Sequence, residues 1–99
     1  MPERRVSEDY LRASRLLGMK VRAARESMGL TQEQLHDLTG ISRNQIQNIE
    51  HSRNNSRDSK SGRPGPGNAR LDTIFLLAEA LKVEVTYLID PTQPIRDAR

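Results

Sequence analysis

Apolar residues in this chain recur three or four positions apart, which is the spacing of one face of an α-helix. The longest such series consists of Tyr10, Leu17, Val21, Ala24 and Met28. With the later stretches of the same spacing, it predicts helices over residues 8–28, 32–39, 43–52 and 71–82, and a short fifth helix around 83–89 that stops before Pro91. The pattern therefore predicts an all-α fold rather than a sheet.

Two of these segments are short and carry their own start signals. Thr31 followed by Gln34, and Ser42 followed by Gln45, are capping-box patterns, in which a hydroxyl accepts from a free backbone N–H and the amide reaches back. Gly40 lies between them, where a left-handed residue can close the first helix. Helices joined by so short a turn cross each other, and one of them keeps an exposed face.

The exposed face of the second short helix is rich in amides. At 100° per residue, Ile46 and Ile49 point to the core, as do Leu35 and Leu38 in the helix before it. The opposite side carries Arg43, Asn44, Gln47, Asn48 and His51. Asn and Gln can bond an adenine edge in two places, and Arg can do the same to guanine. A merely solvated face is usually rich in Lys and Glu, so the pattern favours a helix that enters the major groove of DNA.

Glycine also stands inside the long first helix. Gly18 costs about 1 kcal/mol relative to alanine at such a position. It therefore marks either a kink or a close approach by another helix. Ser7 is a suitable N-cap for this helix, and Gly29 ends it.

The composition limits the classes of protein that fit. Ninety-nine residues with 34% hydrophobic and 3% aromatic residues predict one domain with an aliphatic core. Cysteine is absent, and no apolar run approaches a membrane span or a signal peptide, so we expect a cytoplasmic, nucleoid-associated protein. His36 and His51 fall on different predicted helices without a thiol, a metal-ligand cluster or a phosphate-binding loop. We therefore expect no enzyme activity, no cofactor and no metal.

The positive charge is concentrated in one segment. Residues 51–70 hold five basic side chains and one acidic one, giving +4 where the whole chain has +3. Residues 53–69 are dominated by Asn, Ser, Gly and Pro, which predicts a long loop. Such a basic loop suits a polyanion, although a solvated loop made soluble by its charges is the alternative. Ser61-Gly62-Arg63-Pro64 is similar to half of an AT-hook core, which inserts arginine into a minor groove.

Residues 17–50, LGMKVRAARESMGLTQEQLHDLTGISRNQIQNIE, resemble the Cro/CI-repressor (XRE) type of helix-turn-helix domain, and LDTIFLLAEALKVEVTYLI resembles its last two helices. The resemblance implies a five-helix, lambda-repressor-like domain that usually binds a pseudo-palindromic operator in double-stranded DNA as a homodimer. On this basis residues 1–16 form a mostly helical N-terminal extension, 17–90 the helix-turn-helix domain with a flexible basic insertion at 54–69, and 91–99 a loose tail. The extended first helix and the long loop between the third and fourth helices depart from the family, as does His36, where alanine is common.

The resemblance also implies roles for individual residues. Base-reading positions are Arg43, Asn44, Gln47 and Asn48. Contacts to the DNA backbone fall to Gln32 and Gln45, and the basic loop would add Arg53, Arg57, Lys60 and Arg63. Arg25 and Glu50 occupy the positions of a structural ion pair between the first and third helices.

These observations predict a sequence-specific DNA-binding transcriptional regulator that acts as a repressor. Two alternatives remain open. One is an antitoxin-like protein that binds a partner toxin through a surface containing Tyr10, Leu11 and Leu17 and autoregulates its operon. The other is an interaction module that has lost DNA binding, against which the amide-rich helix and the basic loop argue.

Overall fold

A computed structural model describes residues 8–51 and 70–96 of the chain, and these residues form five helices and no strand. The helices are α1 (Glu8–Ser27), α2 (Gln32–Thr39), α3 (Arg43–Glu50), α4 (Leu71–Leu81) and α5 (Val85–Ile89). The all-α prediction is therefore confirmed. None of the described helices combines the length and the apolar character that crossing a membrane requires.

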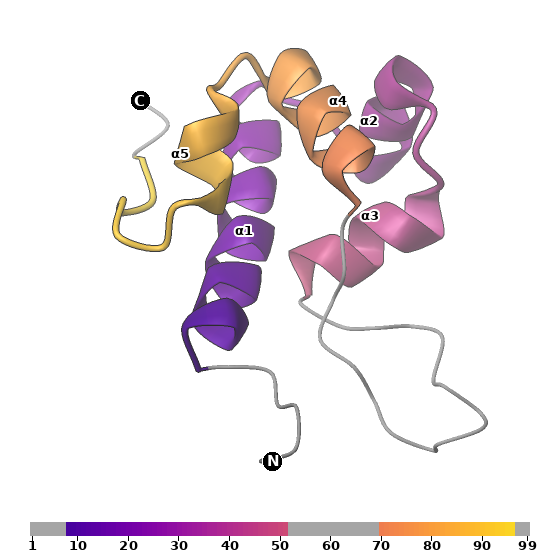
Figure 1. Cartoon of the computed structure of the whole chain (residues 1–99). Helices are drawn as coiled ribbons and strands as arrows, with labels where there is room; N and C mark the ends of the chain where they lie inside the picture. Colours follow the sequence, from indigo (N-terminus) through magenta and orange to yellow (C-terminus); the bar gives the residue numbers. More distant parts are fainter. Residues whose placement is uncertain (1–7, 52–69, 97–99) are drawn as a thin grey trace, which may run out of the picture.

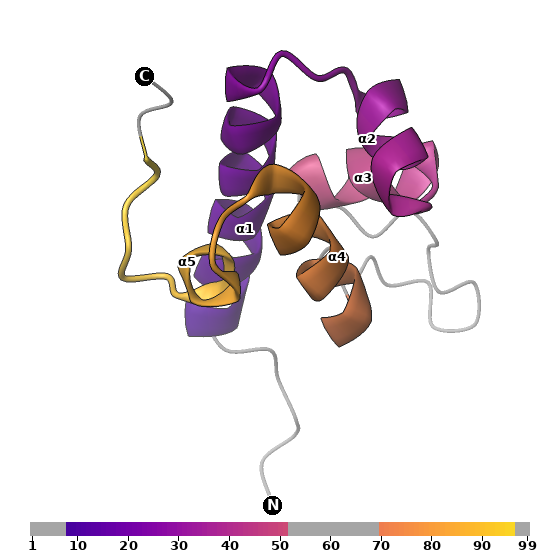
Figure 2. The same ribbon diagram turned by 90° about the horizontal axis from the view of Figure 1, so that it is seen from above.

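The long helix α1 is the centre of the arrangement. It lies between α5 on one side and α3 on the other, while α4 packs against α1, α2 and α5 (Figures 1 and 2). Every helix contributes to one hydrophobic core, aliphatic apart from Tyr87, which consists of Leu17, Val21, Leu35, Ile41, Ile46, Ile49, Leu77, Ala78, Leu81, Tyr87 and Leu88. The antitoxin-like alternative loses part of its surface here, because Leu17 is a core residue and only Tyr10 and Leu11 stay exposed.

The helix ends follow from local geometry. The bounds of α2 agree with the prediction, whereas α1, α3 and α4 each stop one or two residues early. Gly29 (φ 72°) closes α1, since the N–H of Leu30 reaches back to the carbonyl of Arg25 over 3.0 Å, the long bond of a Schellman motif. Lys82 adopts the left-handed conformation (φ 60°) that ends α4.

The prediction that Leu38 faces the core is wrong, since this residue is 60% exposed. Leu35, one turn earlier on the same helix, is completely buried. Helical spacing gives the direction of a side chain around the axis, but it does not say whether a neighbouring helix covers that point. The same reason leaves Tyr10 and Met28 exposed at the two ends of the α1 series.

Gly18 marks a close approach between helices, which was one of its two predicted roles. A Cβ added there would lie 2.2 Å from the carbonyl oxygen of Ile49 and 2.9 Å from that of Glu50. Because those are backbone atoms of α3, no side-chain adjustment could make room. The missing side chain lets the end of α3 rest directly on α1.

The tail is more ordered than predicted up to residue 96. The backbone N–H of Arg96 donates to the Tyr87 hydroxyl over 2.8 Å, and its guanidinium lies 4.0 Å above the centre of the Tyr87 ring. An ion pair of 2.8 Å with Glu84 completes the attachment and lowers the pKa of that carboxyl. Residues 90–96 therefore fold back onto α5 instead of forming a loose end.

Candidate nucleic-acid interface

The two short helices α2 and α3 are built by caps at their starts and a left-handed residue between them. Thr31 forms a complete capping box with Gln34, whose backbone N–H lies 3.0 Å from the hydroxyl while its amide oxygen accepts from Thr31 N–H over 2.9 Å. Ser42 accepts from the backbone N–H of Gln45 over 3.0 Å, so the second box forms only in its first half. Gly40 (φ 78°) turns the chain between the helices.

Side chains of α2 hold this turn in place. The Nδ1 atom of the half-buried His36 lies 2.7 Å from the carbonyl oxygen of Ile41. The hydroxyl of Thr39 donates to the Leu35 carbonyl over 2.8 Å and accepts from the N–H of Ile41 over 3.0 Å. The imidazole at position 36, where the family commonly has alanine, thus points toward the turn and contacts it.

The surface of α3 divides as its pattern predicts. Ile46 and Ile49 are buried in the core, while Arg43, Asn44 and Gln47 are exposed. Asn48 and Gln45 are half-buried at the border between the two faces. The exposed residues lie in the first turns of the helix, and these are the turns that reach deepest when a helix enters a groove.

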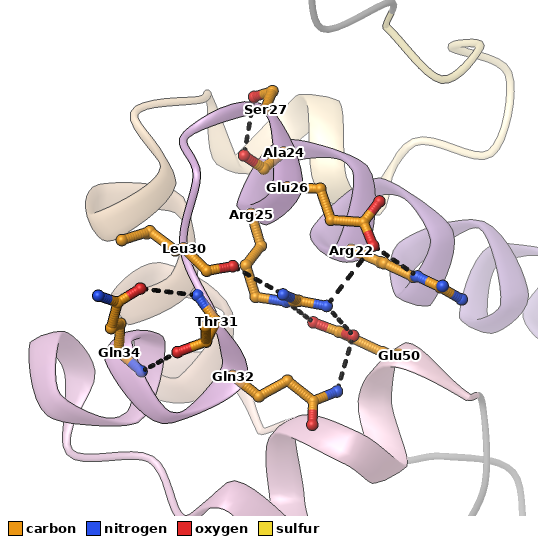
Figure 3. Close-up of polar contacts among 10 residues, drawn as sticks. All are labelled: Arg22, Ala24, Arg25, Glu26, Ser27, Leu30, Thr31, Gln32, Gln34 and Glu50. Atoms are coloured by element: carbon orange, nitrogen blue, oxygen red, sulfur yellow. Dashed lines mark hydrogen bonds and ion pairs between the residues drawn. The ribbon is translucent and has the colours of Figure 1, made fainter.

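A buried carboxylate joins α3 to the two helices before it. Glu50, whose side chain is only 1% exposed, accepts from Arg25 Nε over 2.7 Å and from Arg25 Nη2 over 3.1 Å. Gln32 Nε2 donates to the same carboxylate over 3.0 Å, and Arg25 Nη1 donates to the Leu30 carbonyl over 2.7 Å. Figure 3 shows these groups converging from α1, α2 and the loop between them.

This arrangement has two consequences. The hydrogen bond to Glu50 raises the pKa of Arg25 above its usual value, against the opposing effect of burial. Gln32, which the resemblance assigns to a phosphate, also braces α3 from within the protein. The exposed face of α3 is therefore presented by a helix whose far end is anchored at several points.

A further ion pair joins the starts of α2 and α3 at the surface of the protein. Arg43 Nη1 lies 3.1 Å from Glu33 Oε1, so two exposed side chains at the starts of α3 and α2 are in contact. Glu33 is also close to His36 and Asp37, and one ligand atom from each of the three lies within 4.8 Å of the others. These three residues could hold a metal ion, a cluster that the sequence analysis did not anticipate. Two of them have partners within the protein, because Glu33 pairs with Arg43 and His36 contacts the Ile41 carbonyl.

The basic residues Arg53, Arg57, Lys60 and Arg63, and with them the half AT-hook, lie outside the described residues. Their assignment to the DNA backbone stays a prediction from the sequence.

Lys20 is a residue whose role the sequence analysis missed. It is 0% exposed, and its Nζ donates to the carbonyl oxygens of Tyr87 over 2.7 Å and Asp90 over 2.9 Å. Burial lowers the pKa of Lys20, and the nearby Asp90 opposes that shift. The signal was its position, three residues after Leu17 and four before Ala24, on the apolar face of α1. Lys20 ties α1 to the end of α5 and thereby positions the helix that carries Arg25.

Comparisons with known proteins agree with this geometry. A family model described as helix-turn-helix matches residues 21–58. Among curated proteins no sequence matches. The structure of this chain is similar to that of the restriction-modification controller protein C.AhdI from Aeromonas hydrophila, which has been determined by crystallography. The two share 30% sequence identity, with a TM-score of 0.56. That similarity covers 75% of this chain and 92% of the controller protein.

Proposed function

This chain belongs to the XRE family of helix-turn-helix proteins, which are DNA-binding transcriptional regulators, and we propose that it represses transcription by binding a specific operator through α3. The observation that carries the proposal is the division of α3 into a buried Ile46–Ile49 side and an exposed side with Arg43, Asn44 and Gln47. A helix with this polar face, held rigidly at the surface, matches the width and chemistry of the major groove.

Each exposed residue has a chemical preference. The amides of Asn44 and Gln47 can donate to and accept from an adenine edge, while the Arg43 guanidinium can donate twice to guanine. Gln32 and Gln45 stand at the starts of their helices, where backbone N–H groups and amides meet phosphates. Phosphate contacts provide most of the affinity and its salt dependence, and the base contacts provide the sequence preference.

The internal anchors of α3 serve this task. Arg25 and Gln32 hold Glu50, the last residue of the helix, so its orientation is set before DNA binds. Little conformational freedom is then lost on association, and a small displacement of the base-reading side chains is resisted.

We further propose that the protein acts as a homodimer on a pseudo-palindromic operator. Leu71 and Phe75 are 68% and 54% exposed and lie one turn apart on α4. Leu76, the next residue of α4, is 40% exposed, and Ile89 at the end of α5 is 45% exposed. Apolar side chains at this density on two adjacent elements favour contact with a second copy. Phe75→Glu should convert a dimer into a monomer in sedimentation equilibrium, and an unchanged mass would exclude this surface.

The proposed function is tested by selecting bound sequences from random DNA and sequencing them. A repressor of this type should enrich a two-fold symmetric site with half-sites about one helical turn (roughly 34 Å) apart. Asn44→Ala should weaken binding to that site by about 1–3 kcal/mol and relax preference at one base pair. Equal losses on matched and mismatched sites would show that Asn44 does not read a base, and absence of any enriched site would refute the proposal.

The similarity to C.AhdI favours one biological setting over others. That protein is a restriction-modification controller, so control of a restriction-modification operon is a candidate role for this chain. The enriched site should then occur upstream of neighbouring methyltransferase or endonuclease genes. A reporter fused to that upstream region should be less active in the presence of the protein, whereas increased activity would make it an activator.

A further inference from the structure

Arg43, one of the proposed base-reading residues, already has a partner in the absence of DNA. Its Nη1 atom lies 3.1 Å from Glu33 Oε1, and the two side chains are 66% and 56% exposed. Glu33 is the second residue of α2 and Arg43 the first residue of α3, so the pair connects the starts of the two helices. On the proposed function above, this is the edge of the motif that meets DNA.

The geometry leaves part of the guanidinium available. A guanidinium has five N–H donors in a rigid plane, and Glu33 engages Nη1. The remaining donors can still address a guanine edge while the carboxylate holds the group in place. A phosphate contact differs, because it would bring a second anion beside the Glu33 carboxylate, and like charges repel.

We propose that Glu33 is a specificity-determining residue that acts through Arg43. This inference rests on the proposed function. Glu33 orients the Arg43 guanidinium toward the bases and disfavours its capture by phosphates, which carry no sequence information. Glu33 therefore lowers binding to random DNA more than binding to the operator.

A simpler role for Glu33 gives a different expectation. An acidic residue in the first turn stabilises a helix through its dipole, and Glu33 is placed for that in α2. If this were its entire role, removing the charge would lower thermal stability and leave the ratio of specific to random binding unchanged.

The experiment compares the wild type with Glu33→Gln on a selected operator and on random DNA, over a series of salt concentrations. The variant should bind random DNA more tightly, and the ratio of specific to random affinity should fall about two- to five-fold, the range of an exposed ion pair. One added phosphate contact should steepen the salt dependence on random DNA by about 0.9. Selection with the variant should show a weaker preference for guanine at a single base pair.

Glu26→Gln is a matched control. Glu26 pairs with Arg22 at the same 3.1 Å, these side chains are 55% and 58% exposed, and both belong to α1. The Glu26 carboxylate also lies 4.0 Å from Arg25 Nη2, but it contacts neither Arg43 nor another residue of α3. This variant therefore removes an equal charge from an equally exposed pair without touching the Arg43 guanidinium. Its ratio of specific to random affinity should stay at the wild-type value.

A double variant tests the route through Arg43. In an Arg43→Ala background, Glu33→Gln should leave the affinity ratio where Arg43→Ala alone puts it. The inference is overturned if Glu33→Gln keeps the wild-type ratio, if Glu26→Gln lowers it as much, or if the ratio falls further in the Arg43→Ala background. A wild type that does not distinguish operator from random DNA would instead refute the proposed function, and this inference with it.

Discussion

Replacing Arg25 with methionine tests the reasoning on the buried carboxylate most directly. Methionine keeps much of the length and the apolar stem of arginine but removes the guanidinium. Glu50, with a side chain only 1% exposed, then loses two of its three side-chain hydrogen bonds and keeps that from Gln32. Removing one partner of a buried pair typically costs about 3–5 kcal/mol, since the other charge stays buried and uncompensated.

The structure places the expected cost near the lower end of that range. Gln32 still donates to the carboxylate over 3.0 Å, and the Leu30 carbonyl that loses Arg25 is only partly buried. We therefore expect Arg25→Met to lower the free energy of unfolding by about 3 kcal/mol. Urea unfolding followed by circular dichroism at low temperature measures this, because so large a loss would leave a small domain partly unfolded when warm.

Two further variants separate a buried pair from an exposed one. Arg22→Met removes an ion pair of 3.1 Å whose side chains are more than half exposed, and it should cost less than about 1 kcal/mol. Replacing both Arg25 and Glu50 with methionine removes the uncompensated charge and should recover at least half of the loss. The reasoning is refuted if Arg25→Met costs no more than Arg22→Met. It is also refuted if the double variant loses as much stability as Arg25→Met and Glu50→Met lose together when each is made alone.

Other positions give independent tests. Gly18→Ala gains about 1 kcal/mol of helix propensity. It also forces a methyl group into the α3 backbone, at a cost of about 1–3 kcal/mol or more. Thermal unfolding should therefore show a net loss of stability, and operator binding should weaken. Leu35→Ala should cost about 2–5 kcal/mol in urea unfolding, whereas Leu38→Ala should change stability by less than about 0.5 kcal/mol, and equal effects would contradict the burial found for α2. Lys20→Met should destabilise the protein by about 1–3 kcal/mol, since it leaves carbonyls at the end of α5 without their donor. Burial lowers the pKa of Lys20 below 10.5, so the unfolded chain binds that proton more tightly than the folded protein does. The free energy of unfolding of the wild type should therefore rise relative to that of Lys20→Met as the pH increases toward 10.5. If the wild type instead loses stability relative to Lys20→Met in this range, the prediction is wrong.

The helix caps and helix faces could be predicted from the sequence because each depends on residues only a few positions apart. The capping of α2 by Thr31 and Gln34 involves positions three apart, and both side chains form the bonds that this spacing predicts. The opposite directions of Ile46 and the exposed amides of α3 follow from the helical period alone. A resemblance to a known family then supplied the pairing of Arg25 with Glu50, since nothing local connects residues 25 positions apart.

What a side chain contacts across the molecule was decided by tertiary structure. Leu35 and Leu38 share one helix and one hydrophobic pattern, yet only the first has a helix packed over it. From the sequence a lysine is expected at the surface, but Lys20 is buried because its ammonium group donates to two carbonyl oxygens at the end of α5. The sequence by itself determined where α2, α3 and α4 start and which way each face of α3 points. The packing of α1, α4 and α5 decided which of those faces are covered, because burial depends on neighbours that are distant along the chain.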